Sequence, residues 1–339
     1  MKKIFIALFA LAALTGCYED YVKDFDYSTA YFTYQYDVRT VLPGEIESVN
    51  LTVGMGGVIT NQRDRDLTVA VNNDLLTANL NQFGPVDADG VPTAEKCYAI
   101  EVFKSGASSV GSTFSSASAD FHAYSGIDEL KPMPEEYYKV DLKGMQIKAG
   151  NHTASAPIKF NSTYFEDENA YKPAYALGFE MKKADVDSLL SGKNFSIICF
   201  KCDNKFYGNW YYGGEYTCDG ETVKYPFAIP QLDDQVYTLT TVNASTVKTD
   251  KYLQNKGSLF LTFNGNDITI TSDDINLIDD GRKSYFNNSK LLQDRELHLN
   301  YSFIDAGGKK YEVSDVLYFR DRKRDGCYEW MDENTEHYN

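Results

Sequence analysis

The stretch Phe206-Tyr-Gly-Asn-Trp-Tyr-Tyr-Gly-Gly-Glu-Tyr216 opens the second half of the chain and decides the fold expected there. Strand-like segments, in which apolar residues recur at every second position, follow it. They are Val236–Thr241, Ser258–Phe263, Asp267–Thr271, Glu296–Phe303 and Glu312–Phe319. Turn pairs such as Asn264-Gly265 and Gly307-Gly308 lie between or beside them, as in an up-and-down meander. Residues 204–339 are therefore predicted to form an antiparallel β-barrel.

Gly208-x-Trp210, near the start of this region, resembles the first-strand signature of lipocalin-like barrels. In that family the tryptophan closes one barrel end and a late arginine stacks on it. The resemblance implies structural roles for Gly208 and Trp210. It also implies a cation–π contact from Arg320, with Arg322 as the alternative.

The first half of the chain also reads as strands. Alternation begins at Ser28, where Ala30, Phe32, Tyr34 and Tyr36 share one face. Later short strands recur at roughly ten-residue spacing, which suits two antiparallel sheets packed as a sandwich. A polar break at Asp203-Asn204-Lys205 predicts a boundary between domains 28–203 and 204–339, each expected to fold alone.

The order of segments in the first half resembles a known family. It comprises the aromatic first strand, Asn50–Gly57, Val69–Asn73, Tyr137–Val140 and Met145–Gly150. The family is the immunoglobulin-like N-terminal domain of Bacteroidota surface lipoproteins encoded beside Sus-type glycan importers. The resemblance implies an immunoglobulin-like β-sandwich that acts as a spacer or carbohydrate-binding module, with no catalytic residues. The whole chain is thus expected to be all-β, a sandwich followed by a lipocalin-like barrel.

The N-terminus carries the features of a secretory signal. Lys2 and Lys3 precede an apolar run from Ile4 to Leu14 that is too short to span a bilayer. The ending Leu14-Thr-Gly-Cys17 resembles a bacterial lipobox, which implies a signal peptide over residues 1–16 and a lipid-anchored Cys17. The alternative is a signal peptide with an incidental cysteine.

An acidic tether is expected over residues 17–27. Tyr18–Asp26 holds four acids and one lysine, and it resembles the export signal that sends Bacteroidota lipoproteins to the outer face of the outer membrane. The expected location is therefore the outer membrane, lipid-anchored and facing the exterior. A solvated linker whose charge carries no export signal is the alternative.

Charge and cysteine content limit the partners and the chemistry. The formal net charge of −16 becomes −18 when the two signal lysines are removed, so nucleic acid is an improbable partner and neutral ligands are favoured. Besides Cys17, the chain has Cys97, Cys199, Cys202, Cys218 and Cys327, an odd set that cannot pair completely. Cys199 and Cys202 are three apart on a strand-like run, so their thiols should diverge and be buried.

No catalytic or metal motif stands out. Any pair of carboxylates can be imagined among 49 acids, and the four histidines show no metal-ligand spacing. Neither a Gly-x-Ser-x-Gly elbow nor a phosphate loop is present. The sequence therefore predicts a non-enzymatic protein that needs no cofactor or metal.

Aromatic residues beside glycines and in the polar tail suggest carbohydrate binding. Sugars stack an apolar face on an aromatic ring. Tyr212 and Tyr216 flank Gly213-Gly214, and Tyr328 and Trp330 lie in the acidic C-terminal segment. These four aromatics are the expected ligand-binding residues, although Trp330 could instead cap the barrel core.

The resulting hypothesis is a surface lipoprotein that binds glycan for a Sus-type importer, with the membrane reached through its N-terminal lipid. Three alternatives remain open. They are a glycoside hydrolase, a structural or adhesin-like lipoprotein, and a periplasm-facing lipoprotein without a ligand.

The lipobox makes a direct prediction. Cys17→Ala should give an unprocessed or soluble protein that takes up no lipid label, because the thiol is the point of acylation. Fractionation of cells grown with labelled palmitate checks this. A variant that stays in the membrane fraction with an acylated N-terminus would contradict it. Protease added to intact cells should degrade the wild type, whereas full protection would place it in the periplasm.

Overall fold

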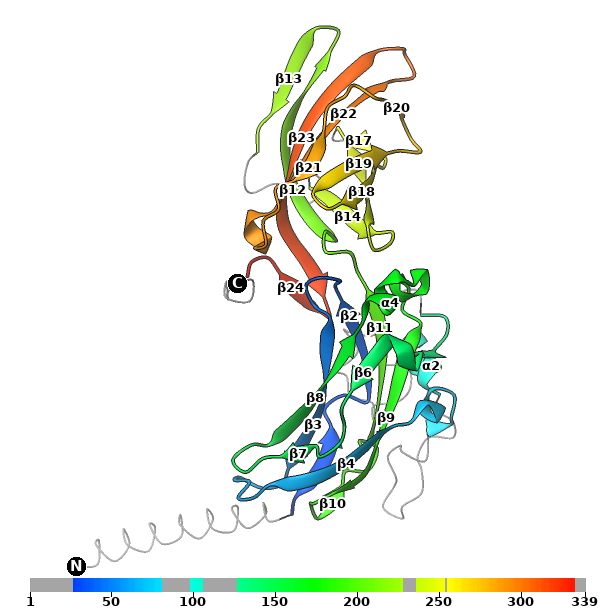
Figure 1. Cartoon of the computed structure of the whole chain (residues 1–339), viewed down its shortest axis with the longest axis vertical. Helices are drawn as coiled ribbons and strands as arrows, with labels where there is room; N and C mark the ends of the chain where they lie inside the picture. Colours follow the sequence, from blue (N-terminus) through cyan, green and yellow to red (C-terminus); the bar gives the residue numbers. More distant parts are fainter. Residues whose placement is uncertain (1–26, 81–97, 106–126, 228–235, 254, 333–339) are drawn as a thin grey trace, which may run out of the picture. The chain divides into compact units, whose positions relative to one another are not determined.

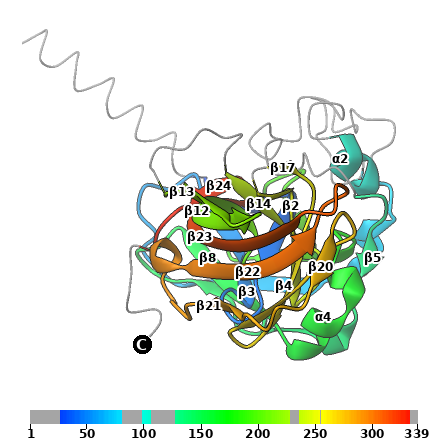
Figure 2. The same cartoon turned by 90° about the horizontal axis from the view of Figure 1, so that it is seen from above.

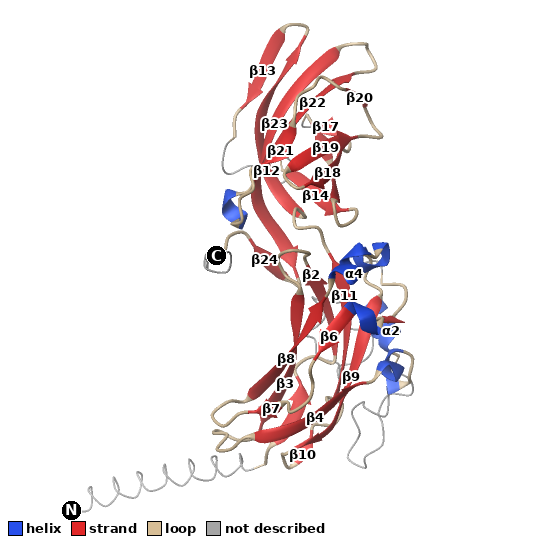
Figure 3. Cartoon of the chain, in the orientation of Figure 1, coloured by secondary structure: helices blue, strands red, loops and turns tan. Residues whose placement is uncertain are grey.

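The computed structural model describes residues 27–80, 98–105, 127–227, 236–253 and 255–332. The signal peptide, Cys17, the tether up to Asp26 and Cys97 lie outside these residues. Strands make up most of the described chain (Figure 3), which confirms the all-β class. No helix in the described part is long and apolar enough to cross a membrane.

The chain forms two compact units, each drawn from several stretches of sequence. The first consists of Met1–Arg39, Ser48–Asn161 and Pro173–Phe200. The second consists of Thr40–Glu47, Ser162–Lys172 and Lys201–Asn339. The passage after Phe200 lies close to the boundary expected at residue 203. Two segments from the first half of the sequence nevertheless belong to the second unit.

Two sheets build the first unit (Figure 1). One has the order β10 (Ser188–Leu189), β1 (Thr29–Phe32), β3 (Ser48–Gly56), β8 (Thr153–Phe160), β6 (Tyr138–Val140). The other has the order β2 (Tyr36–Val41), β11 (Phe195–Cys202), β9 (Tyr175–Ala184), β4 (Arg65–Val71), β7 (Gln146–Ile147), with β5 (Lys131–Pro132) paired to β9. Exposed and buried residues alternate strictly along β8. Phe160 of β8 meets Phe200 of β11 edge-on, with ring centroids 5.0 Å apart, so apolar faces of the two sheets pack together. The immunoglobulin-like assignment of these sheets stays a prediction.

Helical segments are short. They are η1 (Asn73–Leu76), α2 (Ala99–Ser105), η5 (Glu135–Tyr137), α4 (Ser162–Glu166), η6 (Glu168–Tyr171) and η7 (Leu292–Asp294). Leu75 and Phe103, from η1 and α2, join a core cluster with Tyr36 and Phe195. The segments η1 and α2 therefore pack on apolar side chains of the strands.

A barrel forms the second unit (Figure 2). Its strands, in order of pairing, are β12 (Gly208–Cys218), β14 (Tyr237–Thr241), β15 (Thr246–Thr249), β18 (Phe260–Asn264), β19 (Asp267–Thr271), β21 (Ser284–Phe286), β22 (Glu296–Ile304) and β23 (Lys310–Arg324). Pairing of β12 with β23 closes the barrel. The remaining strands extend or flank it: β13 (Glu221–Tyr225), β20 (Asn276–Ile278), β24 (Cys327–Glu329) and the hairpin β16 (Lys251–Tyr252) with β17 (Asn255–Lys256).

Two glycines of β12, the first barrel strand, allow it to pair closely with β23. A Cβ on Gly214 would lie 2.3 Å from the Ser314 carbonyl oxygen, and one on Gly208 would lie 2.5 Å from that of Asp321. Glycine is therefore required where β12 approaches β23 most closely. Trp210 is fully buried, and its indole N–H donates to the Phe206 carbonyl at 3.1 Å.

The expected stacking of Arg320 on Trp210 is wrong. Trp210 and its cross-strand partner Phe319 are buried. Arg320 follows Phe319 and so points to the opposite face of the strand. Its guanidinium lies 5.7 Å from the ring centroid of Tyr211, on the outside of the barrel. Arg322, the alternative, pairs instead with two carboxylates.

A buried ionic cluster ties the Thr40–Glu47 segment into the second unit. The Glu45 carboxylate lies 2.6 Å from Nη2 of Arg295 and 3.1 Å from Nη1 of Arg322. The three side chains are 6%, 4% and 3% exposed, respectively. Nε of Arg322 also lies 2.7 Å from Glu329. Since buried charges are tolerated only when paired, Glu45 is the acid that permits two arginines to be buried here.

We predict that Glu45→Gln lowers the free energy of unfolding by about 3–5 kcal/mol, because it removes the carboxylate paired with the buried Arg295 and leaves Arg322 with Glu329 alone. Denaturant unfolding of the full mature chain measures this. Glu47→Gln is the matched control, since Glu47 is exposed and should cost less than about 1 kcal/mol. Equal effects of the two substitutions would contradict the role given to Glu45. A 204–339 fragment lacks Glu45 and should be less stable than the same residues in the whole chain.

Candidate functional site

The barrel presents two populations of aromatic side chains, one inside and one outside. Alternation along β12 sends Tyr212 inward beside Trp210 and sends Tyr211 outward. Tyr212 is 6% exposed and belongs to the barrel core, and Tyr216 is half-buried against it. Two of the four expected ligand-binding residues thus face the barrel interior.

A buried carboxylate lies among the inner tyrosines. Asp315 of β23 is 1% exposed and accepts hydrogen bonds from Tyr301 at 3.3 Å and Tyr237 at 3.4 Å. Tyr225 of β13 also donates to it. Desolvation raises the pKa of Asp315 to about 6, although these hydroxyl donors oppose the shift. A Cβ on Gly214 would lie 3.0 Å from Asp315 Oδ1, so the glycine also makes room for the carboxylate.

Outside the barrel, ring side chains gather over four neighbouring strands. The residues are Tyr211 of β12, Tyr318 of β23, His298 of β22, Tyr285 of β21 and Phe227 after β13; we call this set the outer aromatic face. Cross-strand register places Tyr211 opposite Tyr318, and His298 opposite Tyr285. Ring centroids are 4.4 Å apart for Phe227 and Tyr318, and 5.8 Å apart for Tyr211 and Phe227. Tyr285 and His298 stack at 4.4 Å with an interplanar angle of 8°.

Glycine also shapes this outer face. A Cβ on Gly213 would lie 2.6 Å from the Phe227 backbone nitrogen. The chain after β13 therefore crosses closely over β12 and brings the Phe227 ring onto the strand surface. Phe227 and Tyr285 are 39% and 41% exposed, so their ring faces are in part open to solvent.

Polar groups border the outer aromatic face. Arg320 lies over Tyr211, and Glu296 stands opposite Tyr318 in the β22–β23 register. Nε2 of His298 lies 3.1 Å from the Glu296 carboxylate. The surface thus combines flat rings with both donors and acceptors.

The two C-terminal candidates lie at the surface. Tyr328 and Trp330 are 59% and 58% exposed, on and just after β24. The alternative in which Trp330 caps the barrel core is therefore wrong. Nζ of Lys323 lies 5.9 Å from the Tyr328 ring centroid. Both rings are available to a ligand.

The outer aromatic face was not identified from the sequence, although part of the signal was present. If Trp210 is a core residue, strand alternation makes Tyr212 an inner residue and Tyr211 an outer one. The joining of Tyr211, Tyr318 and Phe227 depends on cross-strand register, which the sequence does not display.

Among the residues that the structure covers, no three His, Cys, Asp or Glu side chains are placed to hold a metal ion. Cys199, Cys202, Cys218 and Cys327 are free thiols. Cys199 and Cys202 are both 0% exposed, which confirms their expected burial, and this burial raises the pKa of each thiol to about 12.

The buried carboxylate predicts a pH-dependent stability. The pKa of Asp315 in the folded state, about 6, lies above the unfolded value of about 3.9. The stability that the protonated Asp315 carboxyl contributes is therefore complete below about pH 4, and it is lost as the pH rises from the unfolded to the folded pKa. The melting temperature of Asp315→Asn should rise relative to that of the wild type as the pH is raised from about 4 to about 6. Above about pH 6 the difference between the two melting temperatures should stay constant. A wild type that gains stability relative to the variant over that range would contradict the assignment.

Two family models match the sequence. A model described as a "-like, N-terminal domain" covers residues 25–188. A prokaryotic membrane lipoprotein lipid attachment site covers residues 1–17 and so ends at Cys17. No curated protein matches the chain.

Solved structures from Bacteroides resemble the chain. A Bacteroides ovatus protein of unknown function has a TM-score of 0.57 and 15% identity, over 91% of this chain and 98% of its own. A structure from Bacteroides thetaiotaomicron VPI-5482, described as an auxiliary nutrient binding protein, has a TM-score of 0.39 and 13% identity, over 86% of this chain and 95% of its own. The first similarity shows a shared fold. This chain is a membrane-anchored lipoprotein with the fold of the Bacteroides ovatus protein.

Proposed function

We propose that this lipoprotein lies on the exterior of the outer membrane and binds neutral glycan for a Sus-type importer, without catalysing hydrolysis. The outer aromatic face is the observation that carries the proposal. It is a group of rings on consecutive strands of one barrel, of which Phe227 and Tyr285 are exposed and the other three are half-buried. Tyr328 and Trp330 offer a second exposed aromatic pair on the same unit.

The chemistry of a sugar suits this surface. A pyranose presents an apolar C–H face that packs on an aromatic ring, and its hydroxyls need donors and acceptors at the ring edge. Tyr318 and Phe227 supply adjacent rings, and Arg320 supplies guanidinium donors beside them. An open aromatic surface is also accessible to a long polymer, whereas the filled barrel interior is not.

Charge supports a neutral ligand. The mature chain carries a formal net charge of −18, since the total of −16 includes Lys2 and Lys3 of the signal. Such a surface repels polyanions and anionic head groups. Neutral polysaccharide experiences no such repulsion.

The hydrolase alternative lacks support from the most perturbed acid of the barrel. A glycosidase needs a carboxylic acid of raised pKa that reaches the substrate, with a second carboxylate several ångströms away. Asp315 has the raised pKa but is 1% exposed and hydrogen-bonded to three tyrosine hydroxyls.

The adhesin alternative predicts binding to protein and to no free oligosaccharide.

A glycan array probed with the lipid-free mature chain tests the proposal, followed by calorimetry with the best neutral oligosaccharide. Tyr318→Ala should weaken binding about ten- to hundredfold, judged from the loss of one stacked ring. Tyr27→Ala is the matched control, because Tyr27 is 59% exposed but belongs to the first unit. Thermal melts check that each variant folds.

The outcomes separate the candidate surfaces. A loss of affinity in Tyr328→Ala and Trp330→Ala alone would move the site to the β24 pair. Unchanged affinity in all three barrel variants would refute glycan binding by the second unit. An array with no binding to any neutral glycan would refute the function itself.

A further inference from the structure

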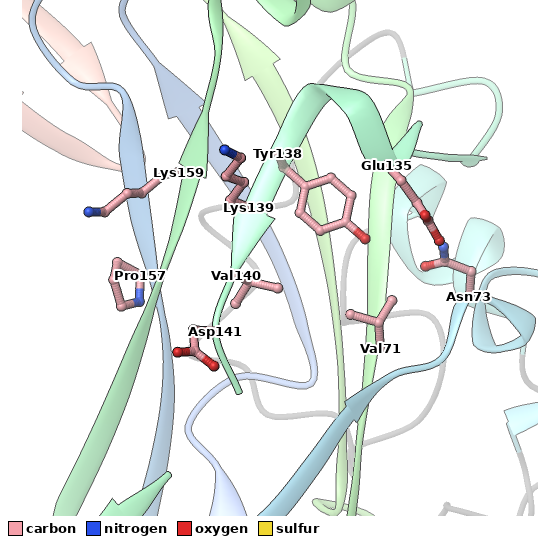
Figure 4. A pocket seen from close by; sticks show the side chains of 9 residues that line it. All are labelled: Val71, Asn73, Glu135, Tyr138, Lys139, Val140, Asp141, Pro157 and Lys159. Carbon is pink, nitrogen blue, oxygen red and sulfur yellow. The ribbon is translucent and has the colours of Figure 1, made fainter. Parts of the chain in front are cut away.

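A groove opens at one edge of the first unit (Figure 4). Its volume is about 890 Å³, and it lies between β6 and the end of β4. Tyr138 and Val140 line it from β6, and Val71 lines it from β4. Glu135 and Asn73 stand close together at one end of it (Figure 4).

The backbone of β6 has a free side toward this groove. The Asn161 N–H donates to the Tyr137 carbonyl, so these two residues form a hydrogen-bonded pair of the antiparallel β6–β8 ladder. Such pairs alternate with non-hydrogen-bonded ones. The N–H and C=O groups of Tyr138 and Val140 therefore point away from β8.

The same reasoning applies to β4. The Asn72 N–H donates to the Gly178 carbonyl, in register with the β4–β9 ladder. The N–H and C=O groups of Val69 and Val71 therefore point away from β9. The neighbouring strand β7 pairs with Arg65 and Asp66, and the Leu67 N–H donates to the Met145 carbonyl just before β7. Within the described residues, no strand pairs with these free sides of β4 and β6.

The side chains give the groove an apolar lining and a balanced rim. Tyr138 and Val140 lie opposite the buried Phe160 and Ile158, and so face the inside of the unit. Val71 lies opposite the buried Phe179 and is still 36% exposed.

The charges at the rim cancel. Its charged residues are Glu135, Asp141, Lys139 and Lys159, two acids and two bases. An uncharged occupant therefore fits best.

We propose that this groove binds a short, uncharged, extended peptide segment of a partner protein by strand addition. Free backbone donors and acceptors recur at every second residue on both edges, the repeat that another peptide backbone matches. Apolar side chains at alternate positions of the segment would pack on Tyr138, Val140 and Val71. This site is separate from the glycan surface proposed on the barrel, and its failure would leave that proposal standing.

The test uses the lipid-free mature chain and the probe acetyl-Thr-Val-Thr-Val-Thr-Val-amide. Binding measured by calorimetry should be accompanied by slower hydrogen exchange of the Val71 and Val140 amides. Two further probes carry N-methyl groups on all valines or on all threonines. At least one of them should bind about tenfold more weakly, because it loses backbone donors on one side.

A charge placed in the groove gives an independent check. Val71→Lys should abolish binding of the peptide, since it adds an unpaired charge to the apolar lining. Val223→Lys is the matched control, because Val223 is a similarly exposed strand valine of the second unit, and it should bind as wild type does. Melting curves confirm that both variants fold.

Three results would overturn the proposal. They are no binding of the unmodified probe at millimolar concentration, equal binding of all three probes, and protection of the Val71 and Val140 amides by neutral oligosaccharides but not by peptide. The last result would identify the groove as a sugar site.

Discussion

The second unit depends on one acidic side chain, Glu45, which is distant in sequence from the two arginines that it neutralises. Removing two guanidiniums from water costs several kcal/mol each, and only a well-placed carboxylate offsets that cost. Glu45 reaches both at hydrogen-bond distance, while Glu329 takes the remaining face of Arg322. The barrel is therefore completed by a segment that lies outside its own run of strands.

The same constraint extends to neighbouring groups. Lys205 lies near this cluster, and its ammonium group is 4.9 Å from the ring centroid of Phe206. Burial lowers the pKa of Lys205, and the positive charge of Arg295 adds to this effect. Arg295 Nε is buried with no hydrogen-bond partner in the described chain. Positive charge is thus in excess here, which makes Glu45 hard to replace.

Barrel geometry divides the tyrosines of the second unit into an inner set and an outer set. The inner ones pack around Asp315 and fill the space that an open barrel could offer to a ligand. The outer ones have no such role, and rings as exposed as Phe227 and Tyr285 are costly to leave bare. The proposed glycan binding uses this outer set, on which a polymer of any length can lie.

The sequence alone was sufficient for the features that depend on neighbouring residues. Alternation along single strands predicted the all-β class and the barrel strands, and the order of residues up to Cys17 predicted the lipid anchor. Tertiary structure decided which distant residues meet. Arg320 faces outward rather than onto Trp210, because strand parity puts them on opposite faces. The pairing of Glu45 with Arg295, the tyrosines around Asp315 and the outer aromatic face all depend on sheet order and register, which non-local pairing sets and local sequence does not encode.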